Sequence, residues 1–313
     1  MRKFLIKSIC FFGVLVLCYF IIYKITYNQA AVKNDFMAAI IDKHEIANGI
    51  KQPKLIFAGG SNLAFGIDSE LIEKKIGKKV VNLSLHAGLG LEFILNELKD
   101  VAQKGDIVFI SPEYFLSVKG NYKLKKLTSS YYKNANNYFT NNFLEDLKIH
   151  IDKSRDNLHN WNLSDNNQIN SQETNINSVK SIYSRNAFNS HGDVISHLEA
   201  EKPKEINDKT NLIYEYWDGI ELINQFNEFE KVNGIKVYFL FPNYPKSEFL
   251  KNKNAIQELE SDLRRDLKVK ILNKPTDFVF NDSLFYDTVY HLDKKGRIIR
   301  TEKLIEIIKK YVK

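Results

Sequence analysis

Residues 54–75 constrain the fold of this chain more than any other stretch. An apolar run of strand length at residues 54–58 ends in two glycines, and Ser61 follows them directly. An amphipathic segment at residues 69–75 then predicts a helix. Because glycine permits backbone angles that a side chain forbids, the pattern is typical of a parallel α/β sheet that presents a hydroxyl at the carboxyl end of a strand. A plain strand-to-helix turn with a surface serine is the alternative interpretation.

Strand-like runs recur along the chain and alternate with helical patterns. This alternation predicts a three-layer α/β/α fold, with a mostly parallel five-stranded sheet of flavodoxin-like type covered by helices on both faces. The expected strands lie at residues 54–58, 79–84, 106–111, 234–241 and 268–272. The expected helices after the serine block lie at residues 69–75, 91–103, 212–232, 246–267 and 294–311.

Residues 1–28 stand apart from the α/β pattern. Basic residues precede an uncharged apolar run from Ser8 to Tyr23, and the segment from Phe4 to Ile25 matches the ~20 residues needed to cross a bilayer. The excess of positive charge before the run predicts a single-pass anchor in the cytoplasmic (inner) membrane, with the main domain on the extracytoplasmic, periplasmic side. A cleaved signal peptide is the alternative. Residues 29–52 are expected to form a juxtamembrane linker or helix that ends before Pro53.

The segment 53–313 is predicted to form one α/β domain with an insertion at about residues 116–210. The insertion is rich in Asn, Lys and Tyr. We expect a helix around residues 143–151 and loop elsewhere. Both cysteines, Cys10 and Cys18, lie in the N-terminal apolar segment, so the stability of the domain must come from its core rather than from disulfides.

The charge of the chain argues against one class of partner. Its 45 basic residues face 38 acidic ones, which gives a formal net charge of +7. The lysines are scattered, without a basic block or an RNA-binding signature, so no nucleic acid partner is predicted. A basic surface suits an anionic glycan and the membrane face equally. The histidines show no metal-ligand spacing, so neither a metal nor another cofactor is predicted.

Residues that can carry chemistry stand near both ends of the α/β segment. Ser61 follows the first strand, and Asp287 and His291 lie just before the last expected helix. In such a set the serine attacks an acyl carbonyl, the histidine takes its proton, and the aspartate orients the imidazole. Asp282 and Asp293 remain alternative acids. Capping of the last helix is the alternative interpretation of the Asp–His block.

With this serine and this late Asp–His block, the chain resembles the SGNH (GDSL-like) hydrolases. It looks most like the membrane-anchored branch associated with polysaccharide O-acetylation and teichoic-acid D-alanylation. The resemblance covers about residues 52–115 and 234–313, and it departs from the family in one spacing, because three residues rather than two separate Asp287 from His291. It implies an extracytoplasmic serine esterase or O-acyltransferase that acts on a cell-surface polysaccharide, with a multipass membrane acyltransferase as a partner.

An acyl-transfer site also needs N–H donors for the developing oxyanion. The amide of Ser61 is the first candidate. The resemblance assigns a second donor to Gly88, with Gly90 as the fallback, although Gly88 is equally explained by turn geometry alone. The asparagine side chain that the family normally provides is absent here, and Asn62 is the candidate replacement.

The stretch that corresponds to the missing asparagine, residues 111–115, contains Glu113 and Tyr114. An ionised Glu113 would repel an oxyanion, so we assign Glu113 and Tyr114 to substrate binding, with Glu113 contacting an acceptor hydroxyl. The missing donor also supports a second class of function. In that alternative, the chain is a non-catalytic binding or scaffold protein for polysaccharide assembly or modification that keeps the fold.

Overall fold

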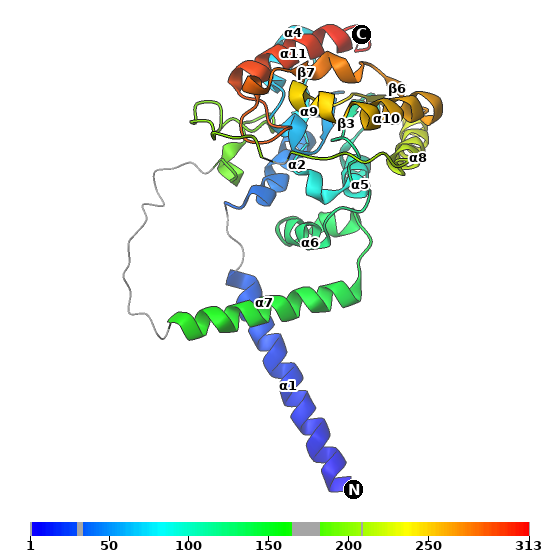
Figure 1. The fold of residues 1–313 in the computed structure, drawn as a ribbon. Coiled ribbons are helices and arrows are strands. Elements are labelled where there is room, and N and C mark those ends of the chain that lie inside the picture. The colour runs from blue at the N-terminus through cyan, green and yellow to red at the C-terminus, as the bar shows by residue number, and fades with distance from the viewer. Residues whose placement is uncertain (1, 30–33, 165–181, 208, 313) are drawn as a thin grey trace. The chain divides into compact units, whose positions relative to one another are not determined.

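The computed structural model describes residues 2–29, 34–164, 182–207 and 209–312 (Figure 1). It divides into two units, which we describe separately. The larger unit comprises Asn34–Phe139 and Lys180–Lys313, and the smaller unit comprises Met1–Lys33 and Thr140–Val179. All the predicted site residues belong to the larger unit, which begins before the expected boundary at residue 53 and excludes part of the insertion.

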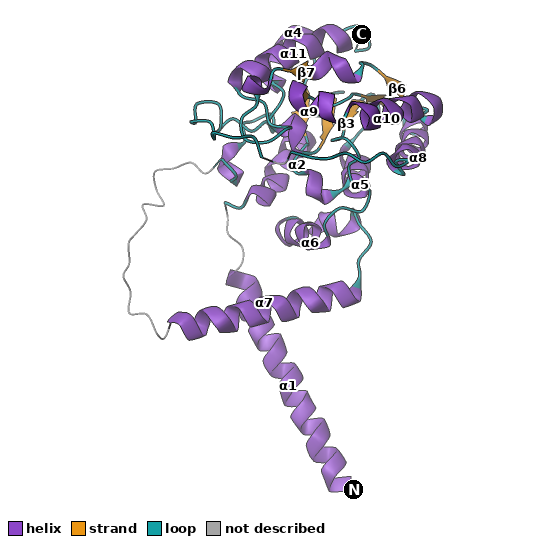
Figure 2. Ribbon diagram, in the orientation of Figure 1, coloured by secondary structure: helices purple, strands orange, loops and turns teal. Residues whose placement is uncertain are grey.

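A five-stranded sheet forms the centre of the larger unit (Figure 2). Its strand order is β2-β1-β3-β4-β6, and every neighbouring pair is parallel. The strands are β1 (Leu55–Gly59), β2 (Val80–Asn82), β3 (Ile107–Ser111), β4 (Lys236–Phe239) and β6 (Lys270–Ile271). The structure therefore confirms the α/β class and the parallel five-stranded sheet. Because β1 and β3 are neighbours, the segments that follow them meet at one edge of the sheet.

Helices cover both faces of this sheet, since successive strand residues point to opposite sides. On one face of the sheet, Ile56 and Ala58 of β1 pack in a core with a first group of helices. On the opposite face, Leu55 and Phe57 of β1 pack in a core with a second group. The first group is α5 (Leu91–Val101), α8 (Gly219–Val232) and α10 (Lys253–Asp266). The second group is α4 (Ser69–Ile76) and α11 (Lys294–Ile308).

Two expected helices differ from the structure. The helix expected at 212–232 begins only at Gly219, because the preceding segment is bound to distant parts of the chain: the Trp217 indole donates to Leu116 O at 2.8 Å, and Leu212 N–H donates to Asn252 Oδ1 at 2.7 Å. The helix expected at 246–267 is two helices, α9 (Lys246–Lys251) and α10, which part at Asn252. Hydrogen bonds between distant segments have therefore overridden local helical pattern.

Shorter elements complete the larger unit. Two-residue strands β5 (Tyr244–Pro245) and β7 (Val279–Phe280) form a separate parallel pair that is too short to show in the sequence. α2 (Ala39–Gly49) lies within the expected juxtamembrane linker and docks on α5, where His44 Nε2 lies 3.0 Å from Glu97 Oε1. In the insertion, α6 (Tyr122–Tyr131) replaces expected loop. The short helices are η1 (Phe36–Ala38), α3 (Ser61–Ala64), η2 (Ala87–Leu89), η3 (Lys133–Asn137), η4 (Arg185–Ala187), η5 (Pro275–Phe278) and η6 (Asp282–Leu284).

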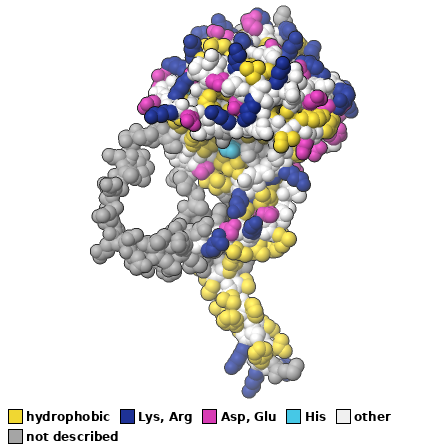
Figure 3. Space-filling model, viewed as in Figure 1, with side chains coloured by type: hydrophobic (Ala, Val, Ile, Leu, Met, Phe, Trp, Pro, Cys, Tyr) yellow, Lys and Arg dark blue, Asp and Glu magenta, His cyan; other side chains and the backbone are white. Residues whose placement is uncertain are grey.

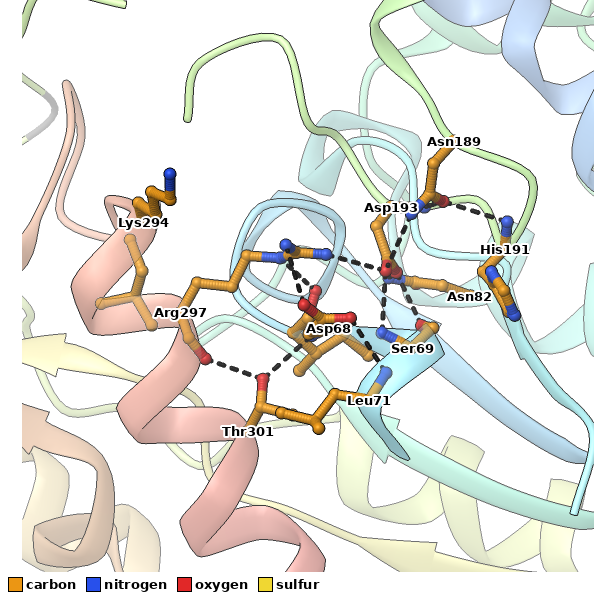
Figure 4. Close-up of polar contacts among 12 residues, drawn as sticks. Asp68, Ser69, Leu71, Asn82, Asn189, His191, Asp193, Lys294, Arg297 and Thr301 are labelled. Carbon is orange, nitrogen blue, oxygen red and sulfur yellow. Dashed lines mark hydrogen bonds and ion pairs between the residues drawn. The ribbon is translucent and has the colours of Figure 1, made fainter. Parts of the chain in front are cut away.

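A buried polar network fixes the end of the insertion to the sheet and to α11 (Figure 4). The fully buried Asp193 carboxylate accepts hydrogen bonds from Arg297 Nη2 at 3.0 Å, from Ser69 Oγ at 2.6 Å and from Asn82 Nδ2 at 2.9 Å. Arg297 also contacts Asp68 at 3.3 Å. The network thereby ties the end of the insertion to the start of α4, to β2 and to α11.

We expect Asp193→Ala to lower the free energy of unfolding by about 3–5 kcal/mol, because it removes the buried partner of Arg297, which keeps only Asp68 as a carboxylate partner, and it leaves the buried donors of Ser69 and Asn82 without this acceptor. Denaturant unfolding followed by circular dichroism measures this change. Glu199→Ala is the matched control, since Glu199 and its partner Lys294 are exposed and such pairs contribute little. Equal unfolding midpoints for wild type and Asp193→Ala would contradict a structural role for the network.

The smaller unit contains α1 (Arg2–Gln29) and α7 (Phe143–Ser164), so the helix predicted around 143–151 is longer than expected. Apolar side chains such as Phe4 and Phe12 are exposed along α1, and Figure 3 shows hydrophobic side chains gathered on that helix. No helix within the described residues is both long enough and apolar enough to cross a membrane. The side chains of Phe20 and of residues 22–29 lie outside the described part, and the anchor at 1–28 stays a prediction.

Candidate active site

The turn between β1 and α3 places Ser61 at the first position of a short helix, with Gly60 as its N-cap. Both glycines of the turn have close neighbours, which are backbone atoms at Gly59 and the end of the Glu113 side chain at Gly60. A Cβ on Gly59 would lie 2.2 Å from the Ser111 carbonyl oxygen, and one on Gly60 would lie 2.3 Å from Glu113 Oε2. The glycine pair thus allows β3 and the residues after it to approach the backbone beside Ser61.

Asp287 is the acid that contacts the histidine. Its Oδ1 lies 2.8 Å from His291 Nδ1, and both side chains are buried. The three residues between Asp287 and His291 form a tight loop. Phe285 and Leu292 close it with a β-bridge, and the Tyr286 N–H donates to His291 O. The other two acids are engaged elsewhere: Asp282 accepts from the Ser247 N–H, and Asp293 caps α11 by accepting from the Gly296 N–H.

A tyrosine from the insertion completes this pair. The Tyr183 hydroxyl donates to Asp287 Oδ2 and lies 3.3 Å from His291 Nδ1. Burial disfavours the charged form of Asp287, but the hydrogen bonds from His291 and Tyr183 outweigh that effect and lower the pKa of the carboxyl. Asp287 is therefore held as a carboxylate that can orient the imidazole and stabilise an imidazolium.

The His291 ring stacks on Phe65, with ring centroids 3.8 Å apart and an interplanar angle of 8°. Phe65 ends the short helix that Ser61 begins, and its N–H donates to Ser61 O at 3.0 Å. The base therefore lies against the same helical turn as the serine. Within the described residues the Ser61 hydroxyl makes no hydrogen bond, and catalytic hydrogen bonds without substrate are often long and tighten only in the complex.

Three of the candidate oxyanion donors already have acceptors. The Gly88 N–H donates to His86 Nδ1 at 2.8 Å, and the Gly90 N–H donates to Ala87 O at 3.0 Å. Asn62 is fully buried, and its Nδ2 donates to Ser111 O at 2.8 Å. The Ser61 N–H, by contrast, has no acceptor among the residues that the structure describes.

Glu113 lies directly at this turn, whereas Tyr114 points into the core. The Glu113 side chain is buried, its Oε1 accepts from the Asn62 N–H at 3.0 Å, and its Oε2 has no hydrogen-bond partner. Burial raises the pKa of Glu113 against the opposing effects of the Asn62 hydrogen bonds and of His291. Tyr114 packs against Phe241 and Tyr244, so it lines the core rather than an open surface.

Arg300 of α11 forms hydrogen bonds to Asn62, in the turn that follows β1 and carries Ser61. Its guanidinium donates to Asn62 O at 2.6 Å, to Asn62 Oδ1 at 3.0 Å and to Asn243 Oδ1 at 2.5 Å. No carboxylate within the described residues lies at ion-pair distance from it. Burial lowers the pKa of Arg300 to about 9, although the charge of Glu113 opposes the shift.

Sequence reasoning missed three residues of this site: Phe65, Tyr183 and Arg300. Only Arg300 carried a signal, since it stands four and eight residues before Leu304 and Ile308, on the helix face where an apolar residue is expected. Phe65 and Tyr183 are aromatic residues without any distinguishing pattern. Their roles follow from contacts between segments more than 100 residues apart in the sequence, such as Tyr183 and Asp287.

Neither the known family models nor the curated proteins with which the chain was compared give a match. The resemblance to the SGNH hydrolases therefore stays a prediction. Within the described part of the chain, no group of three or more His, Cys, Asp or Glu side chains is arranged to hold a metal ion.

Proposed function

We propose that this chain is a serine-dependent acyl esterase or O-acyltransferase. Ser61 attacks the acyl carbonyl carbon, His291 Nε2 takes the hydroxyl proton, and Asp287 holds the imidazole through its Nδ1–H. The observation that carries the proposal is the buried Asp287–His291 pair, whose imidazole stacks on the same helical turn that begins with Ser61.

The substrate that we propose is an O-acyl group on a cell-surface polysaccharide. Transfer and hydrolysis share the acyl-enzyme step, and the acceptor alone distinguishes them. The resemblance supports an extracytoplasmic location at the cytoplasmic membrane and an acyl supply from a multipass membrane acyltransferase. The exposed apolar side chains of α1 support its use as the anchor.

A non-catalytic binding or scaffold role is the second candidate, and a specific observation favours it. The amides of Gly88 and Asn62 already have intramolecular acceptors, and the Glu113 carboxyl lies beside the serine turn. A protein that keeps the fold and binds glycan without chemistry needs no free oxyanion donors. The two functions differ in whether Ser61 is activated.

A fluorophosphonate probe tests for that activation, because it reacts with serines that have a functioning base. We expect the full-length protein in detergent to form a covalent adduct on the peptide that contains Ser61, and Ser61→Ala to form none. Ser247→Ala is the matched control, since Ser247 is an exposed serine on α9. A folded wild-type protein that gives no adduct would favour the binding role, and glycan binding would be measured next.

A further inference from the structure

α7 carries an exposed apolar stripe over its first turns. The stripe consists of Phe143, Leu144, Leu147 and Ile151, whose side chains are 77%, 73%, 40% and 54% exposed. Their spacing of three and four residues places all four on one side of the helix. Ile149, on a different side of the same helix, is buried. The stripe is therefore left largely uncovered by the described residues, and exposed apolar faces of this kind mark contacts with another surface.

Lys148 and Arg155 form a basic border along one side of the stripe. Each stands four residues after an apolar residue of the stripe, and both are exposed. Arg155 lies 3.9 Å from Asp152, but the Arg155 side chain is 76% exposed, and ion pairs of this kind contribute little. The acidic residues Glu145, Asp146 and Asp152 are half-buried and stand outside the stripe. An apolar stripe with an exposed basic border complements the headgroup region of an anionic lipid surface.

The neighbouring helix of the same unit favours a membrane as the partner of this stripe. Within the smaller unit α1 and α7 contact each other, and Figure 1 shows α7 crossing α1 rather than running alongside it. Exposed apolar side chains recur along α1 from Phe4 to Leu17, in the segment that is predicted to enter the bilayer. A helix that crosses an inserted helix lies along the membrane surface, and the charged residues of α7 prevent it from spanning the bilayer itself.

We propose that α7 is an interfacial helix whose apolar stripe inserts among the headgroups of an anionic lipid bilayer, with the basic border at the level of the phosphates. The inference rests on the anchoring by α1 in the proposed function, and it is independent of the acyl chemistry of Ser61. Two helices more than 100 residues apart in the sequence, α1 and α7, then contact the same membrane.

Nitroxide labels on the full-length protein in vesicles of phosphatidylcholine and phosphatidylglycerol test this placement. Alanine replaces the native Cys10 and Cys18, and single cysteines are introduced by Ile151→Cys on the stripe and by Glu145→Cys on the side away from it. The label at residue 151 should collide more with oxygen than with a water-soluble nickel chelate, at an immersion of about 5–10 Å. The label at residue 145 should collide more with the chelate. In vesicles of phosphatidylcholine alone, the label at residue 151 should be immersed less deeply, because the basic border loses its anionic partners.

The label at residue 151 also distinguishes a membrane from other occupants of the stripe. Preferential collision with the chelate at both positions, in a protein that floats with the vesicles, would overturn this inference alone. Protection from both reagents would overturn it too, because protein would then cover the stripe, and spin–spin broadening would identify that protein as a second copy of the chain. Equal immersion in the two kinds of vesicle would overturn the role of the basic border. A full-length protein that does not float with the vesicles would overturn both the anchoring by α1 and this inference, whereas fluorophosphonate labelling of Ser61 would still report on the acyl chemistry.

Discussion

His291→Ala is expected to lower the rate of ester hydrolysis on the order of 10⁶-fold, which is the scale seen when the base of a serine hydrolase triad is removed. The hydroxyl of Ser61 is a weak nucleophile unless a base takes its proton, and among the described residues His291 is the imidazole that stacks on the serine helix. Steady-state hydrolysis of an activated acetyl ester by the purified full-length protein measures the loss.

His191→Ala is the control for this experiment, because the His191 imidazole lies 3.5 Å from the Glu73 carboxylate and belongs to the polar network in Figure 4 rather than to the candidate site. We expect the control to keep the wild-type rate. A His291→Ala protein that is folded and hydrolyses the ester as fast as the control would show that the observed hydrolysis does not use this site.

Asp287→Ala is expected to lower the same rate on the order of 10⁴-fold. Removing the carboxylate leaves the Nδ1–H of His291 without its acceptor at 2.8 Å and removes the charge that stabilises the imidazolium. The Tyr183 hydroxyl lies 3.3 Å from His291 Nδ1, and it is a poor substitute because it carries no charge. The smaller loss than for His291→Ala reflects a base that is still present and is less well oriented.

The two alternative acids provide the matched controls. Asp282→Ala should leave the rate unchanged, and Asp293→Ala should cost about 1 kcal/mol of stability as a lost helix cap while keeping the rate within a few-fold. If Asp293→Ala abolished hydrolysis while Asp287→Ala did not, the acid that serves His291 in solution would be a different one from that in the structure.

The parallel sheet followed from the sequence because its two longest strands, β1 and β3, are nearly continuous apolar runs with both faces buried. Every residue of β1 and β3 is buried, so apolar side chains such as Leu55 and Phe109 are required on both faces of these strands. The sequence did not predict the order of the strands in the sheet. It did not predict the β5–β7 pair either, because two-residue strands carry no periodicity. The sequence analysis did not predict α6, because its N-cap Asn121 and its polar residues are typical of a loop as well as of a helix.

The sequence named candidate residues for a site but gave no view of the electrostatics around them. Ser61, Asp287 and His291 carried sequence signals because each follows or precedes a regular element. The approach of Glu113 to Gly60 carried none, although it brings a buried carboxyl to the Asn62 N–H, the amide directly after Ser61. That approach depends on the pairing of β1 with β3, and a strand-pairing register is a property of the folded sheet rather than of either segment.

The central claim is that Ser61 forms an acyl-enzyme, and trapping that species tests it most directly. The full-length protein would be mixed with an activated acetyl ester, quenched in acid within seconds and analysed by mass spectrometry. We expect an acetyl group on the peptide that contains Ser61 in wild type, and none in His291→Ala or Ser61→Ala. A folded wild-type protein that carries no acetyl group on Ser61 after prolonged exposure would contradict the account and leave glycan binding as the function to pursue.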